Sequence, residues 1–173
     1  MKYCLECGRK LVLKVCGEEG EVPFCDECQV FRFPVFSTAI STAILNREKN
    51  KILLLQQSNR NDYTLLAGYV TKGEDAENTL VREVKEEVGL NIVSYEFMRS
   101  RYFARTNTLM LNYLSIADSE IVPGLNAEVE KAVWFSFDDA LKNIKEKSLA
   151  KIFLSAIIDR VSMRRESLRF PEK

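Results

Sequence analysis

A dense group of carboxylates on one predicted helix constrains this chain more than any other feature. The segment from Glu74 to Val88 has helical periodicity, and it is followed by Gly89, a residue that commonly ends helices in the left-handed conformation. Because a helix advances about 100° per residue, Glu83, Glu86 and Glu87 fall within an arc of about 100°. One face of this helix is therefore strongly acidic.

The adjacent arc is apolar and is expected to pack against the core; it carries Val81, Val84 and Val88. Carboxylates this close repel one another, and their titrations are coupled. A divalent cation would relieve the repulsion, and oxygen ligands favour Mg²⁺ or Mn²⁺. The alternative is a solvated face with ordinary ion pairs, in which Arg82 pairs with Glu86.

The residue spacing from Gly68 to Leu90 distinguishes a metal-binding face from a solvated one. It satisfies the Nudix box, G-x5-E-x7-R-E-U-x-E-E-x-G-U with U an aliphatic residue, at every specified position: Gly68, Glu74, Arg82, Glu83, Val84, Glu86, Glu87, Gly89 and Leu90. The chain thus resembles the Nudix hydrolase family over about residues 35 to 165. The resemblance implies an α/β fold, an α/β/α sandwich with a mixed sheet. It also implies divalent-metal-dependent hydrolysis of a nucleoside diphosphate linked to another moiety.

The same resemblance implies roles for the residues of the box. Glu83, Glu86 and Glu87 would bind Mg²⁺ or Mn²⁺, with the backbone of Gly68 as a further candidate ligand. Arg82 and Glu74 would orient these carboxylates. The general base is expected to be Glu86 or Glu87.

A second segment resembles the family outside the box. Residues 128–135, Glu-Val-Glu-Lys-Ala-Val-Trp-Phe, are similar to the family segment E-I-x-x-A-x-W-F, whose leading glutamate reaches the metal site. Glu128 is therefore a further candidate ligand. The alternative is that Glu128 and Glu130 are solvated loop charges.

All five cysteines lie in the first 28 residues, as two CxxC pairs and the single Cys16. The pairs, Cys4 with Cys7 and Cys25 with Cys28, have the spacing by which four thiolates bind a structural zinc ion. The segment resembles a zinc ribbon. Two disulfides or a redox CxxC are the alternatives, disfavoured by the odd cysteine count and by the lack of a βαβ pattern.

The zinc ion is expected to be structural. Four cysteine ligands leave no open coordination position, and a segment this short has too little apolar material to fold without metal. Cys16 falls beside Gly17 at an expected hairpin tip and is not expected to bind the metal. Gly8, directly after Cys7, is expected to adopt a positive φ in a tight turn.

The combination of ribbon and box resembles the NADH pyrophosphatase branch of the family. Residues 63–70 look like that branch's S-L-L-A-G-F-V segment, and Leu109-Met110-Leu111 matches its L-M-L. Where the branch has S-Q-P-W-P-F-P, residues 100–106 read Ser-Arg-Tyr-Phe-Ala-Arg-Thr, so only the serine matches. The candidate substrate-binding residues in this stretch are Arg101, Tyr102, Phe103 and Arg105.

Two interpretations of that stretch stay open. The arginines could bind an additional phosphate or carboxylate of the substrate, or they could be solvated ends of a strand. Tyr102 and Phe103 could stack on a base, although alternate strand positions would place one of the two in the core.

The rest of the pattern predicts strands interleaved with helices. Strands are expected over residues 37–45, 51–57, 65–70, 92–103, 109–117 and 133–135, and two further helices from residue 136 and over 148–164. Pro34 marks a composition change. We therefore expect a zinc ribbon over residues 1–33, a Nudix domain over 34–165 and a C-terminal tail over 166–173.

Composition excludes several classes of function. The chain has no histidine, which removes Ser-His-Asp and Cys-His catalysis. Its formal net charge is zero, which argues against nucleic-acid binding by bulk positive potential. No apolar run approaches 18 residues and no signal peptide is recognisable, so a cytoplasmic protein without membrane contact is expected.

The leading hypothesis is a pyrophosphohydrolase acting on NADH, NAD⁺, ADP-ribose or a similar substrate. The alternatives are removal of an NAD cap from RNA, a non-catalytic Nudix sensor, or a zinc-ribbon nucleic-acid adaptor. The intact acidic box argues against the sensor, which has no need of metal-binding carboxylates. A homodimer is expected from the family resemblance alone.

Overall fold

The computed structural model describes residues 1–58 and 60–169, with side chains through residue 163. The chain divides into two compact units, Met1–Phe36 and Ser37–Lys173. The division falls three residues after the boundary expected from Pro34. Among the described helices, none has an apolar stretch long enough to span a bilayer.

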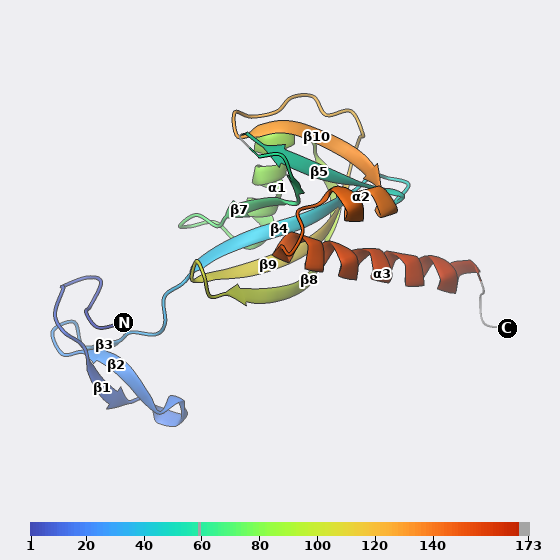
Figure 1. Ribbon diagram of the computed structural model, residues 1–173. Coiled ribbons are helices and arrows are strands. Elements are labelled where there is room, and N and C mark those ends of the chain that lie inside the picture. Colours follow the sequence, from blue (N-terminus) through green and yellow to red (C-terminus); the bar gives the residue numbers. More distant parts are fainter. Residues whose placement is uncertain (59, 170–173) are drawn as a thin grey trace. The chain divides into compact units, whose positions relative to one another are not determined.

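The first unit is a small antiparallel sheet with strand order β1-β2-β3 (Figure 1). Its strands are β1 (Val12–Val15), β2 (Glu21–Cys25) and β3 (Val30–Phe31), and a 3-10 turn, Gly17–Glu19, joins the first two. The buried apolar residues of this unit are few: Cys4, Val22, Phe24 and Cys25. Edge-to-face packing of Phe24 on Phe31, with ring centroids 4.9 Å apart, adds to this small core.

The second unit is built on a seven-stranded mixed sheet with the path β10-β5-β4-β9-β8. Short strands β6 and β7 pair with β5 and β4, and the β4–β9 pair is parallel. The strands are β4 (Ser37–Leu45), β5 (Lys51–Gln57), β6 (Tyr63–Thr64), β7 (Leu66–Tyr69), β8 (Ile92–Phe103), β9 (Thr108–Ala117) and β10 (Val129–Ser136).

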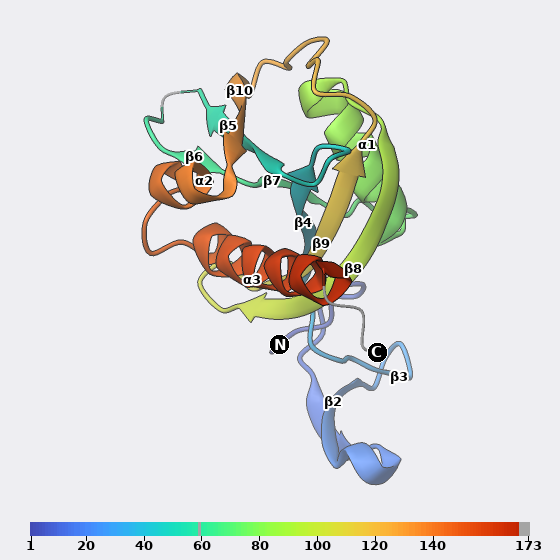
Figure 2. The same cartoon turned by 90° about the vertical axis from the view of Figure 1, so that its right-hand side faces the viewer.

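Helices cover both faces of this sheet (Figures 1 and 2). Helix α1 (Ala76–Val88) lies on one face, and α2 (Phe137–Asn143) and α3 (Leu149–Arg169) lie on the other. The expected α/β/α sandwich with a mixed sheet is confirmed.

The period of two along β4 divides the core between the two faces. Ile40 and Ile44 belong to the cluster that includes the buried residues of α1, while Ala43 and Leu45 belong to the cluster under α2 and α3. Side chains of β4 therefore alternate between the two layers, and the same alternation places site residues on either face.

Helix α1 has the ends expected from its sequence. The Asp75 side chain accepts a hydrogen bond from the Asn78 backbone N–H at 2.7 Å, and Gly89 adopts the left-handed conformation with φ 69°. The helix begins at Ala76, so Glu74 lies before it rather than in its first turn.

The expected packing of Val81 was wrong. The buried face of α1 carries Leu80, Val84, Glu87 and Val88, a spacing of i, i+4, i+7 and i+8, whereas Val81 is 43% exposed. Val81 lies outside this buried stripe, whereas Glu87 lies within it.

Two other bounds differ from expectation. Strand β10 begins at Val129 rather than 133, because a register irregularity between Val129 and Lys131 lets the strand continue pairing with β5 beyond its regular part. Helix α3 continues through Arg169, past the expected end at 164. The expected tail over 166–173 lies outside the described residues from position 170 onward.

The buried stripe of α1 leads to a prediction with a matched control. Leu80 is fully buried, so Leu80→Ala should lower the free energy of unfolding by about 2–5 kcal/mol. Val81→Ala, one residue along, should change it by less than about 0.5 kcal/mol. Urea unfolding followed by circular dichroism measures both. Equal effects would contradict the orientation of α1.

Candidate functional site

The guanidinium of Arg82 binds three carboxylates of the box. Its Nε and Nη2 donate to the two oxygens of Glu74 at 2.8 and 2.9 Å, a bidentate pair. Its Nη1 donates to Glu83 Oε1 at 2.9 Å and to Glu86 Oε2 at 3.0 Å. Arg82 thus reaches both partners expected from sequence, Glu74 and Glu86, and a third.

Glu74 is the fixed end of this network. Besides Arg82, its Oε2 accepts hydrogen bonds from the hydroxyls of Thr79 at 2.8 Å and Thr71 at 3.0 Å. Arg82, followed by these hydroxyls, lowers the pKa of Glu74 to about 2. With both oxygens occupied, Glu74 orients Arg82 and has no oxygen free for a cation.

Gly68 on β7 leaves space for the Glu83 carboxylate. A Cβ atom at position 68 would lie 2.1 Å from Glu83 Cδ, a distance that two carbon atoms cannot occupy. The carboxylate therefore lies directly against the β7 backbone. Burial raises the pKa of Glu83 above its ordinary value, in opposition to Arg82.

Glu87 is the buried acid of the site. Glu87 is 8% exposed, and its carboxylate has no hydrogen-bond or ion-pair partner within the described residues. Burial, followed by the charges of Glu83, Glu128 and Glu86, raises the pKa of Glu87 to about 7. An unpaired carboxylate in this position is costly for the fold unless a cation or a proton joins it.

Glu128 reaches the same cluster from a distant part of the chain. The Asn126 backbone N–H donates to the Glu87 carbonyl at 3.2 Å, and the Ser58 N–H donates to the Glu128 carbonyl at 3.0 Å. The first bond attaches the loop before β10 to the end of α1, and the second attaches it to the residue after β5. The charge of Glu128 acts on Glu87. Glu128 itself is exposed.

These residues fit a hard divalent cation. The donor set is all oxygen, the buried Glu87 carboxylate has no partner among the described residues, and Arg82 binds three of the five acids, Glu74, Glu83 and Glu86, but not Glu87 or Glu128. Glu83 and Glu86 are bound to Arg82, so they would turn from it to share a cation with Glu87.

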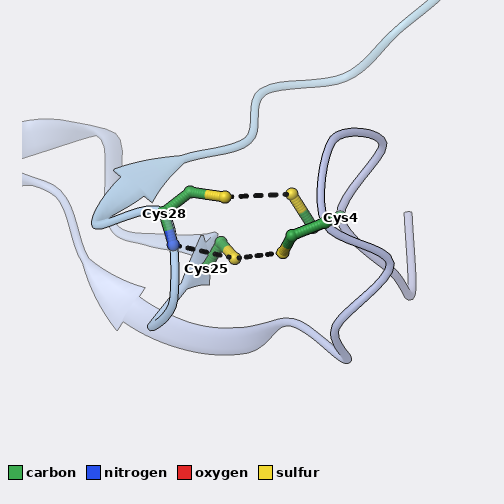
Figure 3. Close-up of side chains that lie close together, drawn as sticks. Cys4, Cys25 and Cys28 are labelled. Atoms are coloured by element: carbon green, nitrogen blue, oxygen red, sulfur yellow. Dashed lines mark hydrogen bonds between the residues drawn. The ribbon is translucent and has the colours of Figure 1, made fainter.

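The four cysteines of the two CxxC pairs form a compact cluster in the first unit. Their sulfur atoms all lie within 4.8 Å of one another, with Cys4 Sγ to Cys28 Sγ at 3.9 Å and Cys7 Sγ to Cys25 Sγ at 3.4 Å. Figure 3 shows the side chains of Cys4, Cys25 and Cys28 turned toward a common centre. The edge of a tetrahedron of sulfurs around zinc is about 3.8 Å, so the cluster fits zinc.

The two pairs share one turn geometry. The N–H of Gly8 donates to the Cys4 carbonyl at 3.0 Å, and the N–H of Gln29 donates to the Cys25 carbonyl at 2.9 Å. Gly8 has φ 73°, as expected, and Gln29 has φ 56°. The residue after each CxxC pair therefore closes a tight turn that brings the pair's two sulfurs together.

The crowding of sulfurs also fits a metal. The neighbouring thiols raise the pKa of Cys28 to about 12, while the backbone N–H of Cys7 lowers the pKa of Cys4 to about 6. Four thiolates would repel one another at these distances, and a bound zinc ion would stabilise them together. Cys16 lies at the β1–β2 turn and is outside the cluster.

The candidate substrate-binding residues lie on β8 and in the turn after it. They do not come together in one site. Arg101 lines a cavity of about 160 Å³ under α3, and Phe103 lines an adjoining cavity of about 430 Å³. Tyr102 is 54% exposed and its hydroxyl donates to Asn107 Oδ1 at 2.7 Å. Arg105 is exposed in the turn after β8 and lines neither of these two cavities.

Sequence reasoning missed several residues of these cavities. Arg99 lines the smaller cavity together with Asn112 and Ser41, and Arg60 lines the larger one. Arg99 precedes Arg101 by two residues on a predicted strand, so the period of two was the signal that could have found it. Asn112 and Ser41 carried no such signal, because only strand register places them beside the arginines.

Comparison with known proteins identifies the family. Residues 36–155 match the NUDIX domain, so the chain belongs to the Nudix family. It is 29% identical over 165 residues to a Pseudomonas aeruginosa protein named NAD-capped RNA hydrolase NudC, covering 93% of this chain and 57% of that protein. A Haemophilus influenzae protein of the same name is 32% identical over 148 residues, covering 83% and 54%. The chain therefore spans about half the length of these relatives.

The fold has close counterparts among solved structures. The NUDIX domain of Shewanella oneidensis NrtR, solved with ADP ribose, superposes with a TM-score of 0.64 at 16% identity, covering 80% of this chain and 94% of that one. At this identity the likeness concerns the fold.

The cysteine cluster predicts how much zinc the protein binds and which of the five cysteines are its ligands. The purified chain should contain about one zinc ion. Cys25→Ser should lose the zinc and unfold the first unit, because this unit's core is small, whereas Cys16→Ser should keep both. Mass spectrometry of bound metal and thiol titration measure this. Zinc loss in Cys16→Ser alone would contradict the assignment.

Burial of Glu87 predicts a pH-dependent stability of the cation-free protein. The pKa is about 7 in the folded chain against 4.5 ordinarily, so the stabilisation is complete below pH 4.5 and is lost as the pH rises through about 7. Glu87→Gln stays neutral and should therefore exceed wild type in stability by about 1–3 kcal/mol at pH 8, with little difference at pH 4.5.

Urea unfolding without divalent cations measures this difference. Glu130→Gln, which neutralises an exposed acid of β10, is the control and should follow wild type at both pH values. A Glu87→Gln variant no more stable than wild type at pH 8 would show that the buried carboxylate is not strained.

Proposed function

We propose that this protein is a Mg²⁺- or Mn²⁺-dependent pyrophosphohydrolase that cleaves the diphosphate of a nucleoside diphosphate linked to another moiety. The observation that carries the proposal is the buried, unpartnered Glu87 beside the carboxylates of Glu83, Glu86 and Glu128. Such a cluster is unfavourable without a cation, and a cation is what a diphosphate needs in order to approach it.

Each residue of the site has a role in this proposal. Glu83, Glu86, Glu87 and Glu128 hold the cation, and the carbonyl of Gly68 is a further candidate ligand. The bound cation would polarise the phosphoryl oxygens and neutralise charge on the leaving phosphate. Arg82, oriented by Glu74, keeps Glu83 and Glu86 in position.

The reaction adds water across one phosphoric anhydride bond. The water oxygen bonds to phosphorus, the P–O–P bridge breaks, and two phosphate monoesters leave. Glu86 or Glu87 accepts the proton of the water. The site needs no imidazole, in keeping with the absence of histidine.

The substrate class follows from the cavities and the relatives. The larger cavity, about 430 Å³, is lined mostly by apolar groups and adjoins Gly68, and its size suits part of a nucleotide. Arg101 lines the smaller cavity and Phe103 the larger one, and both are proposed to contact the substrate, whereas Tyr102 and Arg105 line neither cavity. NADH, NAD⁺ and ADP-ribose are the proposed substrates.

A panel of these dinucleotides with Mg²⁺ or Mn²⁺ tests the proposal. Wild type should release AMP, and Glu86→Gln and Glu87→Gln should each lower kcat by about 100-fold or more, because each removes a ligand or the base. Glu130→Gln should keep wild-type turnover. No hydrolysis of any member, or full turnover by both glutamine variants, would contradict catalysis and favour the sensor.

Removal of an NAD cap from RNA is a second candidate function, favoured by the name of the relatives. It predicts a higher kcat/KM for NAD-capped RNA than for free NAD⁺. Loss of that advantage on deleting residues 1–36 would place RNA binding in the first unit. Salt-dependent RNA binding without hydrolysis would instead favour the adaptor. The homodimer stays a prediction, which light scattering measures.

A further inference from the structure

Four paired residues, three of them polar, form a row across the face of the sheet under α3. Ala67 of β7 pairs with Ser41 of β4, Ser41 pairs with Asn112 of β9, and Asn112 pairs with Arg99 of β8. Since paired residues point to the same face, these four side chains lie side by side. Arg101 belongs to the neighbouring row, opposite Met110.

This row forms one wall of the cavity of about 160 Å³. Leu149 and Phe153 of α3 line the cavity from the other side. Ser41 is 6% exposed, and its hydroxyl has no hydrogen-bond partner within the described residues. Asn112 is 8% exposed, and its Nδ2 donates to the Arg99 carbonyl at 3.2 Å. The Ser41 hydroxyl is open to the cavity, since Arg32 Nε is the one fully buried side-chain polar atom of the described residues that lacks a partner, so Ser41 can donate to a ligand.

The two arginines of this cavity lack counterions. Neither Arg99 nor Arg101 has an ion-pair partner in the part of the chain that the structure describes, whereas Arg82 and Arg160 each bind glutamates. The Arg99 guanidinium lies 6.0 Å from the Phe153 ring centroid. Both arginines are exposed, so solvent screens their mutual repulsion, and an anion in the cavity could accept hydrogen bonds from both guanidinium groups.

The cavity lies within reach of the acidic site. It shares Ala67, Met110 and Leu149 with the larger cavity, and the larger cavity extends to Gly68, against which Glu83 lies. From β7 to β8 there are three strand spacings, about 14 Å. Glu83 lies on the α1 face of β7 and the two cavities lie on its α3 face. Because β7 pairs with β4 alone among the described strands, a single extended ligand that passes the free edge of β7 could place a diphosphate near the glutamates and a second anionic group near the arginines.

We propose that Arg99, Arg101, Ser41 and Asn112 bind a phosphate monoester on the nucleoside-diphosphate substrate, separate from the diphosphate that is cleaved. The inference rests on the proposed function and narrows its substrate class. A phosphate monoester carries nearly two negative charges and three acceptor oxygens, which match two guanidinium groups and a hydroxyl donor. A single carboxylate would leave part of the positive charge unbalanced.

Two matched substrate pairs test the proposal and locate the phosphate. NADP⁺ against NAD⁺ isolates a 2′-phosphate, and coenzyme A against dephospho-coenzyme A isolates a 3′-phosphate. Wild type should show at least about a tenfold higher kcat/KM for the phosphorylated member of one pair. Arg99→Met and Arg101→Met, which keep side-chain volume, should each remove that preference, and Arg99→Met should do so while retaining turnover of the unphosphorylated member.

Arg47→Met is the matched control, since it removes the same charge from an exposed turn between β4 and β5. It should leave the preference unchanged. Equal kcat/KM within both pairs, or a preference that survives in Arg99→Met and Arg101→Met, would overturn the proposal.

A binding measurement keeps this test independent of catalysis. Without added divalent cation, calorimetry should show that adenosine 2′,5′-bisphosphate or adenosine 3′,5′-bisphosphate binds at least about tenfold more tightly than AMP, and that Arg101→Met abolishes the difference. Equal binding of both bisphosphates and AMP would refute the subsite. If no substrate is hydrolysed, the proposed function fails, and this measurement still decides the subsite.

Discussion

The bidentate pair between Arg82 and Glu74 determines how the acidic face of α1 is arranged. Glu74, which also accepts hydrogen bonds from two threonine hydroxyls, occupies Nε and Nη2 of the guanidinium. The remaining nitrogen, Nη1, donates to Glu83 and Glu86. Glu87 lies beyond its reach and is buried without a partner. The protein therefore holds acids together with less positive charge than they need, and this deficit favours the binding of a cation.

Much of this site could be predicted from sequence, because its residues are close together along one helix. Helical geometry alone places Glu83, Glu86 and Glu87 on one arc, and the box spacing assigns Arg82 and Glu74 to them. The same reasoning failed at Val81, because the position of a buried stripe depends on what the helix packs against. Burial of Glu87 within that stripe is likewise a property of tertiary structure.

The cavity under α3 shows where sequence reasoning ends. Ser41, Asn112 and Arg99 are far apart in the chain and meet through strand register, including a register shift between Phe97 and Arg99 on β8. A shift of one residue would turn these side chains to the other face. By contrast, the cysteine cluster was predictable, since each CxxC pair is local and its turn residue, Gly8 or Gln29, brings the sulfurs together.

In the second unit, the backbone of β7 lies between the acidic cluster and the two cavities. Gly68 faces Glu83, while Ala67 on the opposite face belongs to the cavities. Successive positions of this short strand thus belong to different faces of the sheet. A substitution at Ala67 would change the lining of the cavities, whereas one at Gly68 would displace the Glu83 carboxylate.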